Sequence, residues 1–132
     1  MIRDHVRARD AHNHAITIRD QHRDGVRAYG AHCHRLPILV HQAGLAAALH
    51  HTAALKPEKA WLLDHLAEQL ETAELIGGKD REALLGAIRD AGLAETWQLT
   101  REVMRCLDWY RRFAHSVLKV RTSDEEDGGD HP

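Results

Sequence analysis

The sequence predicts an all-α fold, and three observations support this prediction. Ala, Leu, Arg and Glu are abundant, whereas Val and Thr are sparse and aromatic residues make up only 5% of the chain. No stretch alternates apolar and polar residues as a half-buried strand does. Only three prolines and nine glycines interrupt the sequence. We therefore expect a single compact bundle of five to six helices over residues 1–121, since a chain of this length builds one core.

The first half of the bundle contains three apolar or helix-forming stretches. Residues 2–24 are helical by propensity, and Gly25 ends or bends this segment. Gly44 separates an apolar stretch that ends at Val40 from an Ala- and Leu-rich one that begins at Leu45. Pro37 either opens a helix or kinks one, because proline lacks the amide proton that an internal helical position donates.

The second half carries clearer helix boundaries. Pro57 suits the first position of a helix over about 57–75. Asp80 is a candidate N-cap for a short helix over 81–90. The last predicted helix covers about 94–121 and is strongly amphipathic at 100° per residue. Its predicted apolar side consists of Val103, Cys106, Leu107, Tyr110, Phe113, Ala114, Val117 and Leu118, and its opposite side carries Arg101, Arg105, Arg112, His115 and Lys119.

The formal net charge is −2, but the charges are distributed unevenly along the sequence. Residues 1–41 carry +3 and residues 100–121 carry +4, whereas residues 42–99 carry −4. Residues 122–132 carry −5 and hold no apolar anchor, so we expect a disordered acidic C-terminal tail. The two basic segments can meet on one surface and attract a polyanion.

Composition also limits the compartment and the cofactor. Two cysteines, Cys33 and Cys106, are too few for a disulfide framework and fit a cytoplasmic protein. We expect neither a membrane span nor a secretory signal, because no apolar run is long enough. No two of the twelve histidines are three or four residues apart, the spacing that zinc ligands on one helix face require. We expect no metal and no cofactor, and we interpret His32 and His34 as exposed or capping residues.

Catalytic patterns are weak. Arg9/His14, Arg27/His32 and Arg35/His41 have the spacing of a HEPN-type helical ribonuclease, but an Arg- and His-rich chain produces such pairs by chance. Cys106 falls on the apolar side of its helix, and the glutamates near residue 70 have the spacing of a solvated helix face. We therefore expect no enzyme activity.

The basic side chains are the remaining candidate site. Arg19, Arg23 and Arg27 recur every four residues and form a ladder if the helix continues through Gly25. Alternatively, the nearby carboxylates pair with the arginines as ordinary surface ion pairs; these carboxylates are Asp20, Asp24, Glu102 and Asp108. The candidate RNA-binding residues are Arg19, Arg23, Arg27, Arg35, Arg101, Arg105, Arg112 and Lys119.

Two stretches in the expected order resemble one family. The first contains Tyr29-Gly30, a basic residue before Leu36-Pro37, an apolar helix and Gly44-Leu45; the second contains Thr100-Arg101-Glu102, Leu107-Asp108-Trp109 and Arg112-Phe113-Ala114. Together they are similar to the small subunit of type III-B CRISPR effector (Cmr) complexes, over roughly residues 7–119. Departures from the family pattern are Ala43 in place of the usual Asn, the two histidines at positions 32 and 34, and the acidic tail.

The resemblance implies a compact helical bundle without a catalytic centre that serves antiviral defence. It implies that several copies stack along the guide RNA–target RNA channel and contact RNA backbones, the backbone and large subunits of the effector, and one another. Two alternatives stay open, a HEPN-type helical ribonuclease and a free-standing helical adaptor. From the residues themselves we expect a core that includes Leu36, Pro37, Leu45, Leu49, Trp61, Leu66, Leu107, Tyr110 and Phe113. Tyr29 either packs at a helix join, which we favour, or serves as a stacking platform.

Overall fold

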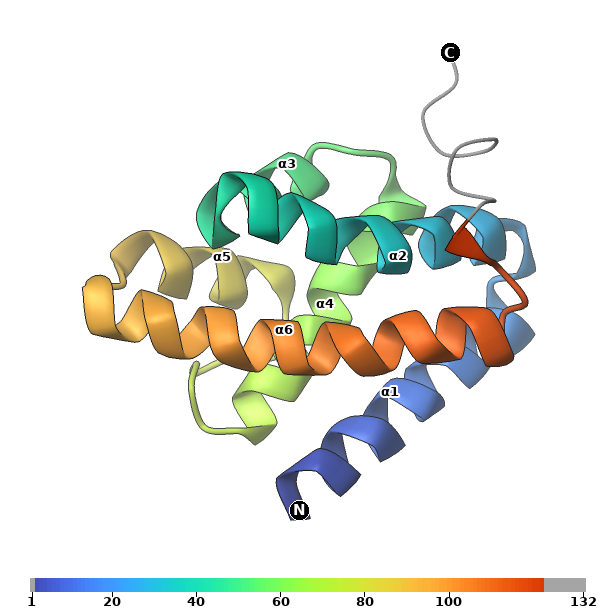
Figure 1. Cartoon of the computed structure of the whole chain (residues 1–132), viewed down its shortest axis with the longest axis horizontal. Helices are drawn as coiled ribbons and strands as arrows, with labels where there is room; N and C mark the ends of the chain where they lie inside the picture. The colour runs from blue at the N-terminus through green and yellow to red at the C-terminus, as the bar shows by residue number, and fades with distance from the viewer. Residues whose placement is uncertain (1, 123–132) are drawn as a thin grey trace.

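A computed structural model describes residues 2–122 and confirms the all-α bundle, with no strand in that range (Figure 1). The acidic tail predicted over residues 122–132 lies almost entirely outside these residues, so its expected disorder stays a prediction. The elements are α1 (Ile2–Gln21), the 3-10 helix η1 (Arg23–Gly25), α2 (Val26–Ala43), α3 (Leu45–Ala53), α4 (Pro57–Thr72), α5 (Arg81–Asp90) and α6 (Leu93–Ser116).

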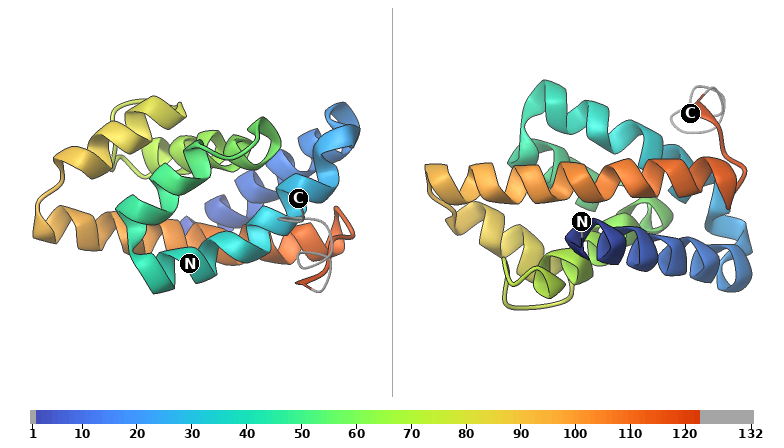
Figure 2. Two further views of the ribbon diagram at one scale, coloured as in Figure 1. Left: turned by 90° about the horizontal axis from the view of Figure 1, so that it is seen from above. Right: turned by 60° about the horizontal axis from the view of Figure 1, so that its bottom comes forward.

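The long helix α6 spans the bundle and organises it. It packs against α1, α2 and α4, and α2 runs beside it in the opposite direction (Figure 1). Helix α4 in turn packs against α2, α3 and α5. Two further views show α1 and α2 on different sides of α6 (Figure 2). One long face of α6 is therefore covered by other helices, and the other is open to solvent.

The predicted local boundary signals are confirmed. Pro57 occupies the start of α4. The carboxylate of Asp80 accepts a hydrogen bond from the amide of Ala83 at 2.9 Å, which caps α5. Gly44 has φ +90°, a conformation that glycine adopts readily, and it separates α2 from α3.

The expectation that the last helix extends to residue 121 was wrong. Helix α6 ends at Ser116, and Lys119 then adopts a left-handed conformation with φ +61°. This turn folds Val120 back onto α2, where its side chain lies directly over Gly30. The Val120 carbonyl accepts a hydrogen bond from Nε2 of His34 at 2.8 Å. The amphipathic pattern continued past the true end because Val117, Leu118 and Val120 still pack on the core after the helix has stopped.

The N-terminal segment also differs from the predicted ladder. Helix α1 ends at Gln21, and η1 interposes a tight turn before α2. Gly25 sits against the ring of Trp61, where a Cβ atom would lie 2.5 Å from Cζ3. Helix α2 begins at Val26, so Pro37 lies inside it rather than opening it.

The core largely follows the prediction. Among the expected members, Leu36, Leu45, Leu49, Leu66, Leu107, Tyr110 and Tyr29 are buried, whereas Pro37, Trp61 and Phe113 are partly buried.

The core also contains an ion pair between α1 and α6. Nε of Arg7 lies 2.6 Å from Oε2 of Glu102, and its Nη2 donates to Oε1 at 2.9 Å. Arg3 adds a third contact to Glu102 at 3.0 Å. Burial raises the pKa of Glu102, but the hydrogen bonds and charge of Arg7 outweigh burial and lower the pKa below its usual value. The alternative in which Glu102 forms an ordinary surface ion pair with one of the candidate arginines was therefore wrong.

Candidate nucleic-acid interface

The candidate interface begins with the solvent side of α6. Arg101, Arg105 and Arg112 are exposed there, as the amphipathic pattern predicted. We call these three residues the α6 basic stripe. At 100° and 1.5 Å per residue they lie within about 40° of one another around the helix axis, and Arg105 is about 6 Å from Arg101 along it. The stripe therefore presents its guanidinium groups in one direction, over about 17 Å of helix.

The members of the stripe differ in how they are held. The Arg101 guanidinium lies over the ring of Trp97, 5.2 Å from its centroid. Arg112 lies over Trp109 at 4.7 Å and also pairs with Asp108 at 3.1 Å. Arg105 has no ion pair within residues 2–122. The surface-pair alternative thus applies to Arg112 but not to Arg101 or Arg105.

The other predicted residues do not extend the stripe. Arg19 is exposed at the end of α1 and pairs with Asp20 at 2.9 Å. Arg23 belongs to η1 and Arg27 to the first turn of α2, so the break after Gln21 disrupts their four-residue ladder. Arg35 is half-buried in α2. Lys119 is exposed, but it lies beyond the end of α6.

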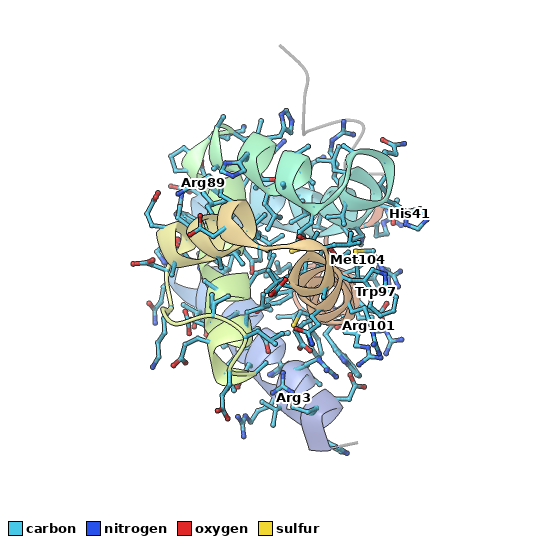
Figure 3. The ribbon with its side chains drawn as sticks, turned by 90° about the vertical axis from the view of Figure 1, so that its left-hand side faces the viewer. Arg3, His41, Arg89, Trp97, Arg101 and Met104 are labelled. Carbon is cyan, nitrogen blue, oxygen red and sulfur yellow. The ribbon has the colours of Figure 1, made fainter. Side chains whose placement is uncertain are left out.

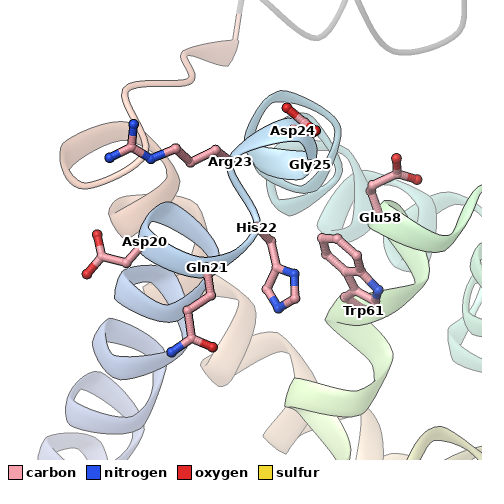
Figure 4. A pocket seen from close by; sticks show the side chains of 8 residues that line it. All are labelled: Asp20, Gln21, His22, Arg23, Asp24, Gly25, Glu58 and Trp61. Atoms are coloured by element: carbon pink, nitrogen blue, oxygen red, sulfur yellow. The ribbon is translucent and has the colours of Figure 1, made fainter.

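A hollow of about 430 Å³ occupies the turn between α1 and α2 (Figure 4). Carboxylates of Asp20, Asp24 and Glu58 stand around it, and Trp61 forms one wall. The Arg23 side chain points away from Glu58 and Trp61 (Figure 4). Because three carboxylates and only one guanidinium, that of Arg23, line this hollow, it is a poor site for a polyanion.

The histidines at positions 32 and 34 are buried, which corrects the expectation that they are exposed or capping. His32 faces α3, where its Nε2 lies 2.8 Å from the Thr52 hydroxyl, whereas His34 contacts the segment that follows α6. They project to different sides of α2, as a spacing of two residues requires. Because α2 packs against α3, α4 and α6, both sides are covered. His32 is thus inaccessible to an RNA substrate, which weakens the Arg27/His32 ribonuclease pair.

A polar cluster that sequence reasoning missed lies between α1, α2, α4 and α6. The rings of His14 and His65 stack with centroids 4.0 Å apart. His14 Nδ1 lies 2.6 Å from the Tyr110 hydroxyl, and His65 Nδ1 lies 2.6 Å from the Tyr29 hydroxyl. Burial lowers the pKa of His65 to about 3, with further contributions from the charges of His14 and His22. These partners come from distant parts of the chain, so no local motif could have indicated them.

Both cysteine thiols are held in the core. Cys33 and Cys106 are buried, and burial is the main cause that raises the pKa of each thiol. The described residues contain no group of three His, Cys, Asp or Glu side chains that could hold a metal ion. No helix among them is long and apolar enough to cross a membrane.

Fold and site together define a small all-α protein whose candidate site is an exposed basic helix face. Comparison with known proteins gives the family. The model of the family described as CRISPR-associated protein (Cas_Cmr5) matches residues 3–117. The chain therefore belongs to the Cmr5 family, which confirms the resemblance to the Cmr small subunit.

Two relatives from Thermus thermophilus agree with this assignment. The chain is 35% identical over 85 residues to CRISPR system Cmr subunit Cmr5, a match that spans 64% of this chain and 70% of that protein. The crystal structure of a CRISPR-associated Cmr5 family protein superimposes with a TM-score of 0.77 at 32% identity. That match covers 86% of this chain and 96% of the other.

Proposed function

We propose that this protein is a non-catalytic, RNA-binding structural subunit of a type III-B CRISPR effector complex in the cytoplasm. Several copies stack along the guide RNA–target RNA channel, beside the backbone and large subunits. Base pairing reads the target sequence in such a machine, and the small subunit contacts RNA backbones. The observation that carries the RNA-binding part is the α6 basic stripe, in which Arg101 and Arg105 are exposed and have no ion pair within residues 2–122.

Charge and shape support a backbone contact. Arginine forms planar, bidentate hydrogen bonds with phosphate oxygens, and three arginines on one helix face suit an extended strand better than a compact ligand. The contacts are individually modest and sensitive to salt, so several copies in a row would bind more strongly than one.

The placement of the reactive groups supports a non-catalytic role. The thiols are buried with raised pKa values. Arg9, which has the ribonuclease spacing to His14, pairs with its neighbour Asp10 at 3.1 Å, while His14 contacts Tyr110 and Glu68. The Arg9 and His14 side chains are thus engaged by different partners.

Purification of the assembled complex tests the proposal. The protein should co-purify with the other Cmr subunits and with bound RNA, and the purified chain should leave labelled RNA intact in Mg²⁺ or Mn²⁺. Cleavage that disappears in His14→Ala would favour the ribonuclease alternative. Absence from a complex that is otherwise complete and RNA-bound would favour a free-standing adaptor.

A further inference from the structure

The first turns of α6 expose an unusual amount of apolar surface. Leu93 is 89% exposed and Trp97 is 64% exposed. Figure 3 shows Trp97, Arg101 and Met104 on one side of α6, with His41 nearby at the end of α2. Trp97 does not line the hollow between α5 and the start of α6, and its exposure places the ring on the surface of the bundle.

We propose that Trp97 is a stacking platform for an unpaired RNA base, while Arg101 and Arg105 hold the phosphates that flank this base. The inference rests on the proposed RNA-binding function and names a mode of contact that the basic stripe alone does not provide. Aromatic side chains beside basic ones are the usual means of binding single-stranded nucleic acid without sequence preference.

The geometry of the three side chains supports this mode. Arg101 follows Trp97 by about 40° around the helix and about 6 Å along it, and Arg105 follows by the same step again. The cation–π contact holds the Arg101 guanidinium over one face of the indole at 5.2 Å, and in the proposed mode the base takes the other face. A base that stacks on the indole would bring its own phosphates into reach of both arginines.

The second Trp–Arg pair of α6 provides a contrast. Trp109 is half-buried, and its indole N–H donates to Asp4 at 3.0 Å, which fixes the ring against α1. Its arginine, Arg112, is held by Asp108. The contacts of Trp109 and Arg112 within the bundle thus explain their positions. The Trp97 indole, in contrast, has no hydrogen bond within residues 2–122.

The distribution of charge favours a nucleic acid over a protein partner at this surface. Glu95 lines a hollow against α5, and Glu102 is buried with Arg7 on the α1 side. The carboxylates of this half of α6 therefore lie away from Trp97, and the charged side chain that contacts the indole is Arg101. An exposed indole in contact with a guanidinium suits a base with its phosphates.

The test uses the full chain and two single-stranded RNAs of equal length. One is an oligouridine with a single 2-aminopurine, whose fluorescence falls when it stacks, and the other is abasic at every position, so that no base can stack on Trp97. Trp97→Ala is compared with Leu93→Ala, which removes a still more exposed apolar side chain one turn earlier, and with Trp97→Phe, which keeps an aromatic ring. Circular dichroism checks that all three variants melt like the parent.

We expect Trp97→Ala to weaken binding of the base-bearing RNA by about tenfold and to abolish the 2-aminopurine quenching. It should leave both the affinity for the abasic RNA and the salt slope unchanged. Leu93→Ala should behave like the parent, and Trp97→Phe should restore most of the quenching.

Equal affinity and quenching in Trp97→Ala and the parent would overturn the stacking inference, and the proposed function would stand if binding stayed salt-dependent. Loss of complex assembly with RNA affinity intact would also overturn it and would assign Trp97 to a protein contact. Absence of any salt-dependent RNA binding by the parent would overturn the proposed function together with the inference.

Discussion

Replacement of Glu102 by alanine should strongly destabilise the protein. The side chains of Glu102 and Arg7 are only 9% and 7% exposed, and two short hydrogen bonds join them. Removal of the carboxylate leaves the Arg7 guanidinium buried with only the 3.3 Å contact to Asp4. Breaking a buried pair in this way costs about 3–5 kcal/mol. For a domain of this size that corresponds to a fall in Tm of about 12–20 °C.

Urea unfolding at pH 7, followed by circular dichroism, measures this change. Asp108→Ala is the control, because Asp108 forms exposed pairs with Arg111 and Arg112 on the same helix and should cost less than about 1 kcal/mol. The double variant Arg7→Met, Glu102→Leu should recover much of the stability, since apolar groups leave no charge unpaired. A cost for Glu102→Ala no larger than that for Asp108→Ala would refute the argument.

Three further predictions concern pH, packing and the C-terminus. The pKa of His65 is lowered from 6.5 to about 3 in the fold, so the unfolded chain takes up a proton on this side chain at a higher pH than the folded protein does. The stability that the neutral His65 contributes is therefore fully present above pH 6.5 and is lost as the pH falls. Unfolding free energy should therefore drop by about 2 kcal/mol between pH 6.5 and pH 5, and an equal drop in His65→Gln would contradict this. Gly30→Ala should cost about 1–3 kcal/mol in urea unfolding, because its Cβ would lie 2.7 Å from Val120, whereas Gly77→Ala meets no atom within 4 Å and serves as the control. Deletion of residues 122–132 should leave Tm nearly unchanged and raise RNA affinity at low salt, since the segment carries −5; a large fall in Tm would show that it packs.

The parts of the fold that the sequence predicted well depend on local chemistry. Asp80 caps a helix with its own side chain, Pro57 suits a first turn, and Gly44 takes a positive φ. The exposed position of the α6 basic stripe follows from helical periodicity alone. These signals act within a few residues, so they can be read without knowledge of the neighbouring helices.

The parts that the sequence did not predict depend on distant contacts. Helix α6 ends where Val120 packs on Gly30, which precedes it by ninety residues. The sequence around Glu102, an Arg-rich helix, predicts a surface position for this residue. Glu102 is buried because α1 packs against α6 and places Arg7 beside it. The predicted ladder from Arg19 to Arg27 failed because Gly25 must fit against Trp61 in a tight turn.

The most direct test of the proposed function measures the salt dependence of RNA binding by the assembled complex. A variant with Arg101, Arg105 and Arg112 all changed to Gln should keep its helix content, because Gln is also a good helix former. It should bind RNA more weakly whatever the sequence, with a salt slope lowered by about 0.7–0.9 for each phosphate that an arginine no longer neutralises. Arg89→Gln, which removes an exposed arginine of α5 (Figure 3), should leave the slope unchanged.

An unchanged affinity and slope in the triple variant would contradict the proposal that the stripe contacts RNA. Failure of the variant to assemble before RNA is added would contradict it as well, since the stripe would then hold a neighbouring subunit. Either result would leave Arg19, Arg23, Arg27 and Arg35 as the remaining candidates for the RNA contact.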